Sequence, residues 1–161
     1  MTPAVDELVS DGCAHRIVSY EHDPARGSYG LEAAEALGVE PGQVFKTLVV
    51  GLVSGDDRQG DLAVAIVPVS AMLDLKAVAK AAGSKKAVMA DVAAAERSSG
   101  YVAGGISPFG QKRRLPTFVD ETIAMWDEVL VSAGRRGLEI AIAPVDLVRI
   151  INATEAAIAS V

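Results

Sequence analysis

The sequence predicts one compact domain that mixes helices and strands, an α/β (α+β) fold. Its 161 residues match the size of one domain, and such a chain buries about 70% of the surface that its unfolded form exposes. Hydrophobic residues make up 50% of the chain but aromatic residues only 4%, so the core must consist mainly of Val, Ile, Leu and Ala. Segments with helical periodicity and segments typical of strands follow one another along the chain. We therefore expect residues 1–161 to form a single domain.

Capping signals predict where the helices begin. Thr2 and Pro3 favour a helix start, because a threonine hydroxyl caps a helix well and proline suits the first helical position. Ser28, Asp74 and Asp91 are expected to cap three later helices. Most of these helices are followed by glycine, a common C-terminal stop. The expected helices cover residues 3–11, 30–37, 75–82, 92–98 and 144–151, with a short helical end from residue 154.

Apolar runs predict the strands. The run 44–53 is apolar on both faces, which indicates a central strand. Residues 55–61 are polar and are expected to form a hairpin loop, so that 62–69 returns antiparallel to 44–53. Residues 133–137 are expected to form a tight basic turn between the last two strands. The expected strands cover residues 16–21, 44–53, 62–69, 86–89, 126–132 and 138–142.

Lys46 stands out within the apolar run 44–53. A strand period of two places it on the same face as Val44, Leu48 and Val50. A lysine buried there without a partner costs several kcal/mol. The pattern leaves two interpretations open: Lys46 lies at the strand end and its amine reaches water, or it is a cation that lines the mouth of a pocket.

The stretch 104–120 contains three glycines and two prolines in 17 residues. Glycine permits positive φ and close backbone approach, whereas proline fixes φ and lacks an N–H donor. We expect a rigid, basic, solvent-facing loop whose backbone amides can cradle an anion or a carbonyl oxygen. An ordinary surface loop is the competing interpretation. A nucleotide-binding P-loop is excluded, because Gln111 stands where lysine is required and no Ser or Thr follows.

Charge and composition limit the functional classes. The net charge of −6 argues against broad, non-specific binding of DNA or other nucleic acids. Basic clusters at 85–86, 112–114 and 135–136 are either local footprints or solvated faces. No apolar run approaches the roughly 18 residues of a membrane span, and the N-terminus does not resemble a signal peptide. A single cysteine, Cys13, excludes an internal disulfide and suits a reducing cytoplasm.

The side chains offer few catalytic devices. The two histidines, His15 and His22, lie on the two sides of a short predicted strand, and Cys13 fits no metal-binding spacing. A Ser-His-Asp or Cys-His arrangement also lacks support. No paired carboxylates lie inside an apolar strand. Any catalysis must therefore come from a cation, from hydroxyls, from backbone amides or from the substrate itself.

Six segments in fixed order resemble a known family over nearly the whole chain. The sequence closely resembles the bacterial YbaK/EbsC family, the Cys-tRNA(Pro) deacylases of the prolyl-tRNA synthetase editing-domain superfamily. The segments are Tyr-Glu-His-Asp-Pro at 20–24, Val-Phe-Lys-Thr-Leu at 44–48, Leu-Asp-Leu-Lys at 73–76, Gly-Gly-Ile-Ser-Pro at 104–108, Gly-Gln-Lys-Arg-Arg-Leu-Pro-Thr at 110–117 and Ser-Ala-Gly-Arg-Arg-Gly-Leu-Glu at 132–139.

The resemblance implies a compact fold around a twisted, partly closed mixed β-sheet flanked by helices. It implies a trans-editing function in the cytoplasm, in which cysteine is removed from tRNA(Pro) that prolyl-tRNA synthetase has mischarged. Editing is needed because a pocket for a small apolar side chain discriminates by only about 1–3 kcal/mol per methylene. The implied partners are the 3′ end of an aminoacylated tRNA and prolyl-tRNA synthetase, with no cofactor, metal or membrane.

The resemblance also implies site residues. Lys46 matches the family's essential lysine, which contacts the acyl-adenosine end of the tRNA. The family often has aspartate where this chain has Glu139, which leaves the contact of that carboxylate open. The residues expected to bind the substrate are Tyr20, Thr47, Gly104, Gly105, Ile106, Ser107, Pro108, Ser132 and Glu139. Those expected to contact tRNA are Lys112, Arg113, Arg114, Arg135 and Arg136.

In this family the substrate's own thiol is thought to attack the ester and release a cyclic thiolactone, which agrees with the scarcity of protein nucleophiles. Lys46 and the loop amides would then position the substrate and stabilise the developing oxyanion. Two alternatives stay open. One is an alanine-specific editor, against which the signature at 110–117 argues. The other is a non-catalytic module that binds a tRNA end or a synthetase, for which the acidic net charge is mild support.

Overall fold

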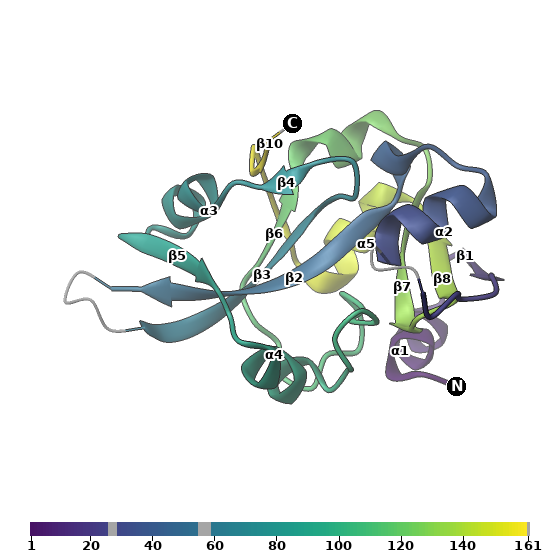
Figure 1. Ribbon diagram of the computed structural model, residues 1–161, viewed down its shortest axis with the longest axis horizontal. Helices are drawn as coiled ribbons and strands as arrows, with labels where there is room; N and C mark the ends of the chain where they lie inside the picture. Colours follow the sequence, from purple (N-terminus) through teal and green to yellow (C-terminus); the bar gives the residue numbers. More distant parts are fainter. Residues whose placement is uncertain (26–28, 55–58, 161) are drawn as a thin grey trace.

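The computed structural model describes residues 1–25, 29–54 and 59–160 and has a mixed α/β fold. In Figure 1 the long strands β2 and β3 cross the molecule from its narrow end toward a second group of strands. The helices are α1 (Pro3–Asp11), α2 (Tyr29–Leu37), α3 (Leu75–Ala82), α4 (Val92–Ser99) and α5 (Pro144–Ile151), with 3-10 helices η1 (Pro41–Gln43) and η2 (Glu121–Met125). The strands are β1 (His15–Ser19), β2 (Phe45–Val53), β3 (Gln59–Pro68), β4 (Met72–Leu73), β5 (Lys86–Met89), β6 (Thr117–Asp120), β7 (Val129–Arg135), β8 (Leu138–Ile142), β9 (Thr154–Ala156) and β10 (Ala159–Ser160).

The largest sheet is mixed, as expected. It has the order β5-β2-β3-β6-β9, in which β2 pairs antiparallel with both β5 and β3, while the β3–β6 and β6–β9 pairs are parallel. A separate antiparallel sheet has the order β1-β8-β7. The two sheets touch where Val44, just before β2, forms a parallel bridge with Leu130 of β7. This contact partly closes the arrangement of strands.

The predicted helix starts are confirmed where the structure describes them. The side chain of Thr2 accepts a hydrogen bond from Val5 N, and Asp74 and Asp91 cap α3 and α4 in the same way. Each such cap stabilises a helix by about 1 kcal/mol. Gly12 ends α1 in the left-handed conformation, with φ of 82°. Ser28, predicted to cap α2, and most of the predicted hairpin loop at 55–61 lie outside the described residues.

The prediction for the C-terminal tail was wrong. Instead of a helical end, residues after 153 form β9, which pairs with β6, and β10, which pairs with β4. Asp120 holds this tail, because its Oδ1 accepts hydrogen bonds from Ile158 N and Ala159 N. Ile158 is fully buried. The tail is rich in alanine, which favours helix locally, but distant partners in β6 and β4 decide its conformation.

The prediction of a solvent-facing loop over 104–120 was also wrong for its middle part. Ser107 and Phe109 have no exposed surface, and burial of a phenylalanine stabilises the fold by roughly 1.5–3 kcal/mol. The loop passes against α1, because Gly110 N donates to Glu7 Oε1 and the Tyr101 hydroxyl donates to the carbonyl of Phe109. The last four residues, Thr117–Asp120, form β6 rather than loop.

The strand predicted over 126–132 is shifted. β7 begins at Val129 and continues to Arg135, so the turn to β8 is shorter than the predicted turn at 133–137. An irregularity in pairing between Ser132 and Arg135 allows this extension. Gly134 has a φ of 112°, a conformation that residues with a side chain rarely adopt. Gly134 therefore allows β7 to continue to Arg135, where the sequence indicated a turn.

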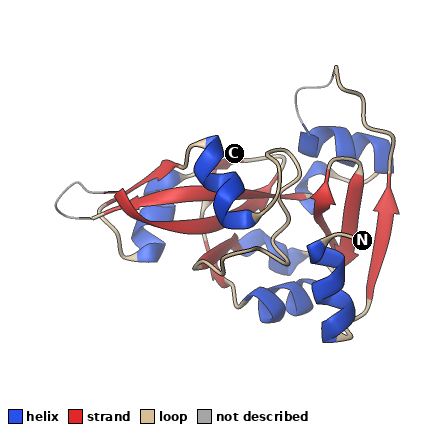
Figure 2. Ribbon diagram, turned by 90° about the horizontal axis from the view of Figure 1, so that it is seen from below, coloured by secondary structure: helices blue, strands red, loops and turns tan. Residues whose placement is uncertain are grey.

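The core lies on both faces of the large sheet. One cluster lies between this sheet, α1 and the β1-β8-β7 sheet, and includes Leu8, Phe45, Phe109 and Ile140. A second cluster lies under α3 and joins it to β2 and β3. Figure 2, seen from below, shows the helices distributed around the strands rather than gathered in one layer.

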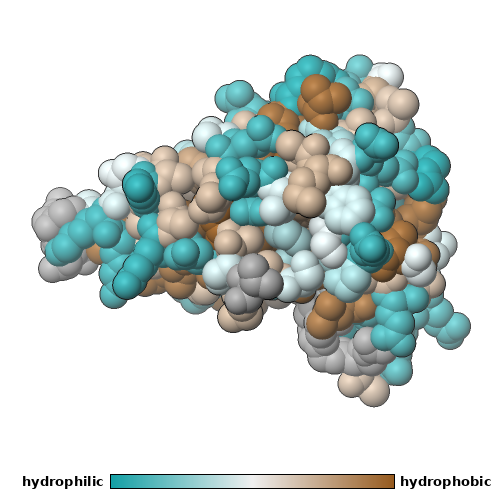
Figure 3. Space-filling view, turned by 90° about the horizontal axis from the view of Figure 1, so that it is seen from above, coloured by the Kyte–Doolittle hydropathy of each residue, from teal (hydrophilic) through white to brown (hydrophobic). Residues whose placement is uncertain are grey.

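In the described part of the chain, no helix has the length and apolar character that crossing a membrane requires. On the face that Figure 3 shows, apolar residues form only small, separate patches.

One edge of β2 lacks a neighbouring strand over its first half. β3 pairs with β2 along its whole length, but β5 pairs only with Val50–Val53. On the β5 side, residues 45–48 therefore have no paired strand among the described residues. This gap sits beside the bridge between Val44 and Leu130, and the candidate site lies there.

Candidate functional site

A cavity of about 370 Å³ lies along the unpaired part of β2. Its size falls in the range of small-molecule sites. Side chains from β2, from the β1-β8-β7 sheet and from the loop after α4 form its wall. The lining residues are Tyr20, Gly30, Val44, Phe45, Lys46, Thr47, Leu48, Val69, Gly104, Ile106, Ser132, Arg135, Arg136 and Glu139.

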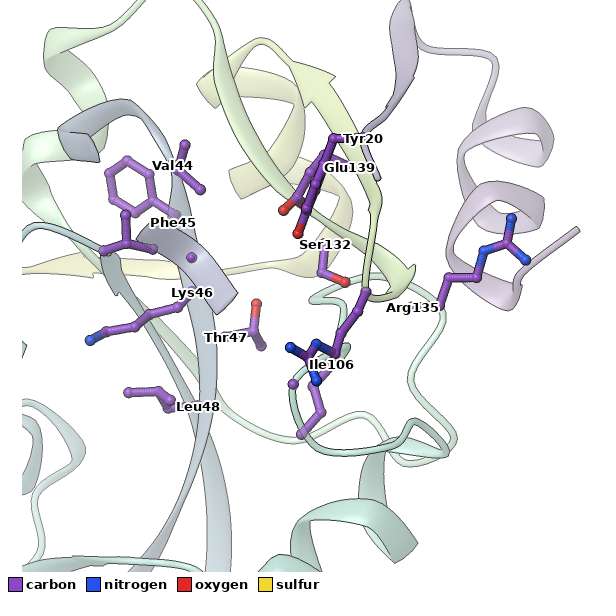
Figure 4. Close-up of a pocket in the computed structure, with 14 residues that line it drawn as sticks. Tyr20, Val44, Phe45, Lys46, Thr47, Leu48, Ile106, Ser132, Arg135 and Glu139 are labelled. Atoms are coloured by element: carbon purple, nitrogen blue, oxygen red, sulfur yellow. The ribbon is translucent and has the colours of Figure 1, made fainter. Parts of the chain in front are cut away.

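Lys46 and Thr47 reach this cavity from opposite faces of β2. In Figure 4 Lys46 and Leu48 leave one side of the strand, whereas Thr47 points from the other side toward Ser132 and Glu139. Successive side chains along a strand point to opposite faces, so the neighbours Lys46 and Thr47 must leave opposite sides of β2. Both residues border the same cavity because β2 has no paired strand there on the β5 side.

Three polar side chains gather on the opposite wall through strand pairing. Ser132 of β7 and Glu139 of β8 are directly opposite each other in the ladder. Glu139 also faces Val18 of β1, and Tyr20, two residues further on, shares that face. Figure 4 shows Tyr20 and Glu139 beside each other above Ser132. The sheet therefore places a phenol, a hydroxyl and a carboxyl on one wall.

Burial changes the acid–base properties of this wall. Burial raises the pKa of Glu139 to about 7, because the carboxylate loses water without gaining a cation that compensates. Burial also raises the pKa of Tyr20, and the nearby Glu139 adds to that effect. Tyr20 is therefore a hydrogen-bond donor at neutral pH, and Glu139 exchanges its proton near neutrality.

Desolvation lowers the pKa of Lys46, which is half-buried. Desolvation disfavours the charged form of the amine, so the position of Lys46 has an electrostatic cost. Lys46 borders the cavity, and its role there stays a prediction.

Two cavity-lining residues, Thr47 of β2 and Glu139 of β8, each have a buried polar atom without a hydrogen-bond partner among the described residues. These atoms are Thr47 Oγ1 and Glu139 Oε2. Their residues are only 8% and 7% exposed. Buried polar atoms are nearly always satisfied in folded proteins, and leaving one unsatisfied costs about 1–3 kcal/mol. Both atoms are therefore suited to bind polar groups of a ligand.

The glycine loop contributes its residues unequally. Gly104, with φ of 91°, and Ile106 line the cavity. Gly105, Ser107 and Pro108 do not; Pro108 instead borders a separate small pocket of about 30 Å³. The five residues therefore do not act as one cradle.

The residues behind the wall fix the loop. Gly105 N donates to the carbonyl of Val102, and a Cβ on Gly105 would lie 2.9 Å from the Cα of Arg135. Ser107 Oγ accepts from Phe109 N, and the Gln111 side chain donates to the Ser107 carbonyl. These contacts give Gly105 and Ser107 a positioning role, because they hold Gly104 and Ile106 against β7 and β8.

The two basic clusters predicted to contact tRNA lie in different places. Arg135 and Arg136 line the cavity, and Figure 4 shows the exposed side chain of Arg135 turned away from Glu139. Lys112, Arg113 and Arg114 are exposed but are not among the residues that line the cavity. Arg114 also forms an ion pair with Glu7 at 3.4 Å and donates to the carbonyl of Ile150.

Sequence reasoning did not identify five wall residues. Val44, Phe45, Leu48 and Val69 look like ordinary core residues, and their apolar character alone does not identify them as cavity residues. Gly30 is necessary because a Cβ there would lie 2.1 Å from Val69 Cγ1. That contact joins α2 to the residue after β3, and no signal in the sequence around Gly30 could have revealed it.

Nothing in the described chain gathers three or more His, Cys, Asp or Glu residues in a metal-binding arrangement. Cys13 and His15 are not among the cavity-lining residues. His22 lies next to the site but its Nδ1 pairs with Glu32 Oε1 at 2.7 Å. The cavity therefore offers one amine, three hydroxyls, one carboxyl and two guanidinium groups, with no thiol or imidazole on its described wall.

Comparisons with known proteins agree on a family. The sequence model of the aminoacyl-tRNA editing domain matches residues 24–150. A protein from Enterococcus faecalis (strain ATCC 700802 / V583), named EbsC and described as a candidate Cys-tRNA(Pro)/Cys-tRNA(Cys) deacylase, is 39% identical over 142 residues. The match covers 86% of this chain and 83% of that protein.

Solved structures show the same fold. The crystal structure of a candidate trans-editing enzyme for prolyl tRNA synthetase matches with a TM-score of 0.81 and 24% identity, covering 100% of this chain and 99% of the other. The crystal structure of a hypothetical protein matches with a TM-score of 0.85 and 21% identity, covering 99% of this chain and 100% of the other. The predicted fold around a mixed sheet is confirmed.

Proposed function

This chain belongs to the aminoacyl-tRNA editing domain family, and from that premise we propose that it is a trans-editing deacylase that removes cysteine from Cys-tRNA(Pro). The observation that carries the proposal is the cavity on the unpaired edge of β2. Its volume of about 370 Å³ suits the aminoacyl group with its ribose. Its wall carries both an amine that can contact ribose or phosphate and polar groups that can contact the ester.

The chemistry of cysteine fits a wall without thiol or imidazole among its described residues. The substrate thiol attacks its own ester carbonyl, so a carbon–sulfur bond forms and the carbon–oxygen bond to the terminal ribose breaks. The products are a four-membered thiolactone and tRNA with a free ribose hydroxyl. Alanine and proline carry no side-chain thiol, so the substrate itself provides much of the selectivity.

Lys46 and the loop supply positioning and electrostatic stabilisation in this proposal. Lys46 approaches from the side of β2 opposite Thr47, which suits a contact with the ribose or phosphate of the terminal nucleotide while the aminoacyl group lies toward Ser132. Backbone amides near Gly104 and Ile106 stabilise the oxyanion that develops on the ester carbonyl. Mutational loss of one such donor typically costs about 10²–10³ in rate.

The partners follow from charge. A chain with a net charge of −6 gains little from long-range attraction to tRNA phosphates, so Arg135 and Arg136 hold only the acceptor end. Prolyl-tRNA synthetase supplies tRNA identity in this proposal. The site of action is the cytoplasm, where mischarged tRNA is produced.

A deacylation assay with Cys-, Ala- and Pro-tRNA(Pro) tests the proposal. We expect turnover of Cys-tRNA(Pro) at least tenfold above that of the other two. Preferential turnover of Ala-tRNA(Pro) would instead identify an alanine editor, and binding without turnover would identify a non-catalytic module. Repeating the assay with Cys-tRNA(Cys), with and without the synthetase, tests the partner: equal discrimination in both conditions would refute its role.

A further inference from the structure

Glu139 is the one carboxyl group among the described residues that line the cavity. Its residue is 7% exposed, and its Oε2 is buried with no hydrogen-bond partner in the described structure. Glu139 is held in place by pairing with Ser132 on one side and Val18 on the other. A rigid strand therefore presents an unsatisfied carboxyl oxygen to the bound ligand.

The charged and titratable groups around Glu139 come from several elements. Tyr20, after β1, interacts electrostatically with Glu139, Glu32 of α2 and Arg136 of the β7–β8 turn. Glu32 itself pairs with His22. On β2, Lys46 leaves the face opposite Thr47 and does not point toward Glu139. Tyr20 stays protonated at neutral pH because its pKa is raised, so it cannot take a proton there.

The proposed reaction needs a proton acceptor. A thiolate, not a thiol, is the nucleophile, and an unperturbed thiol has a pKa of about 8.5. A general base works best when its own pKa is near the working pH. Burial raises the pKa of Glu139 to about 7, so this carboxylate is a stronger base than an exposed glutamate and is still largely ionised at slightly alkaline pH.

Resting on the proposed deacylase function, we propose that Glu139 is the general base that removes the proton from the substrate thiol. The proton passes from sulfur to Oε2 as the sulfur attacks the ester carbonyl. As the carbon–oxygen bond breaks, the ribose oxygen leaves with the electron pair and takes up this proton. Glu139 is thereby returned to its carboxylate form, and no other reactant is consumed. Tyr20 and Ser132 position the reacting groups beside it.

Replacing Glu139 with Gln tests the proposal, because Gln keeps the size but cannot accept a proton. We expect E139Q to lower the single-turnover rate on Cys-tRNA(Pro) by about 10²–10⁴-fold, the usual contribution of a general base. The wild-type rate should rise with pH around an apparent pKa near 7, and E139Q should lack this rise. E139D should keep it. Glu155, which is exposed and does not line this cavity, provides the matched control E155Q, with an unchanged rate.

A selenol substrate separates a base from a structural role. A selenol is more acidic than a thiol and is already ionised at neutral pH, so it needs no base. We expect the defect of E139Q on tRNA(Pro) charged with selenocysteine to be at least tenfold smaller than its defect on Cys-tRNA(Pro). Equal defects on both substrates would overturn the proposal, and misfolding cannot mimic the difference, because one protein preparation is used for both. If the wild type fails to turn over Cys-tRNA(Pro), the proposed function fails instead.

Discussion

Lys46 and Thr47 are neighbours in β2 whose side chains leave opposite faces of the strand, and both line the same cavity. In a fully paired strand, two such side chains would be separated by the sheet. Here β5 pairs only with Val50–Val53, so the edge of β2 beside residues 45–48 is open on that side. A ligand at this edge can contact both faces. The missing strand pairing, rather than any single side chain, creates the site.

Lys46→Ala should abolish deacylation and leave the fold intact. Burial alone lowers the pKa of Lys46, so its charge costs free energy and is kept for a reason other than folding. We expect at least a 100-fold loss of the single-turnover rate and a change in unfolding free energy within about 1 kcal/mol. Single-turnover kinetics and urea unfolding measure both quantities.

Lys76→Ala is the matched control for Lys46, because Lys76 is exposed on α3 and does not line the cavity. It should keep the full rate. Near-normal turnover by Lys46→Ala would remove this lysine from the site, and failure of that variant to fold would make it a structural residue.

Gly105→Ala should displace the glycine loop. The added Cβ would lie 2.9 Å from Arg135 Cα and 3.2 Å from Arg136 N, both backbone atoms that cannot move aside easily. Such overpacking typically costs about 1–3 kcal/mol. Because Gly104 and Ile106 move with the loop, the deacylation rate should fall at least tenfold. Gly60→Ala adds the same methyl group where nothing lies within 4 Å. It should change neither the unfolding free energy nor the deacylation rate. A wild-type rate in Gly105→Ala would show that the loop does not set the geometry of the site.

Glu139 should make the fold less stable as the pH rises. Its pKa is about 7 in the folded protein against 4.5 for an ordinary glutamate, so the folded state binds more protons between these values. The unfolding free energy therefore falls from pH 4.5 through 7, by on the order of 3 kcal/mol at about 1.4 kcal/mol per pKa unit. Glu139→Gln should remove this loss, so its stability relative to wild type should increase between pH 5 and pH 8.5. Urea unfolding at both values measures it, and a constant difference would contradict the raised pKa.

Cys13→Ala should keep full activity. Cys13 lies beyond the end of α1 and does not line the cavity, and burial raises the pKa of its thiol. It is therefore a poor nucleophile at neutral pH. Mass spectrometry should find no cysteinyl-enzyme during turnover. Loss of activity in the variant, or such an adduct on Cys13, would indicate protein nucleophilic catalysis.

The sequence predicted best where local chemistry decides the structure. The caps at Thr2, Asp74 and Asp91 and the β2–β3 pairing are properties of neighbouring residues, and the structure agrees with them. The tail could not be predicted, because β9 and β10 exist only through pairing with β6 and β4 and through the hydrogen bonds to Asp120. Such contacts leave no local signal.

The site was predicted in its polar residues more than in its geometry. Lys46 stands out in the sequence as a cation within an apolar strand, whereas Tyr20 and Glu139 were expected only from the family resemblance, and all three line the cavity. The sequence could not show that only some residues of the glycine loop line the cavity, because the burial of Ser107 depends on packing against distant residues. Gly30 is important only because of Val69, which lies 39 positions away in the printed sequence.

Arg135 and Arg113 should differ in their effect on tRNA, although both are exposed and both were predicted to contact it. Arg135 borders the cavity and turns its guanidinium outward, so it can reach phosphates of the nucleotides that precede the terminal adenosine. Arg113 belongs to the cluster away from the cavity wall. We expect Arg135→Ala to weaken binding of a single-stranded acceptor end and to reduce the slope of log K against log salt by about 0.7, the value for one phosphate contact on a single strand. Arg113→Ala should leave the slope for this short oligonucleotide unchanged and lower it only for intact tRNA. Fluorescence anisotropy across a salt series measures both slopes. Equal slopes for the two variants on the oligonucleotide would remove Arg135 from the proposed contact with the acceptor end.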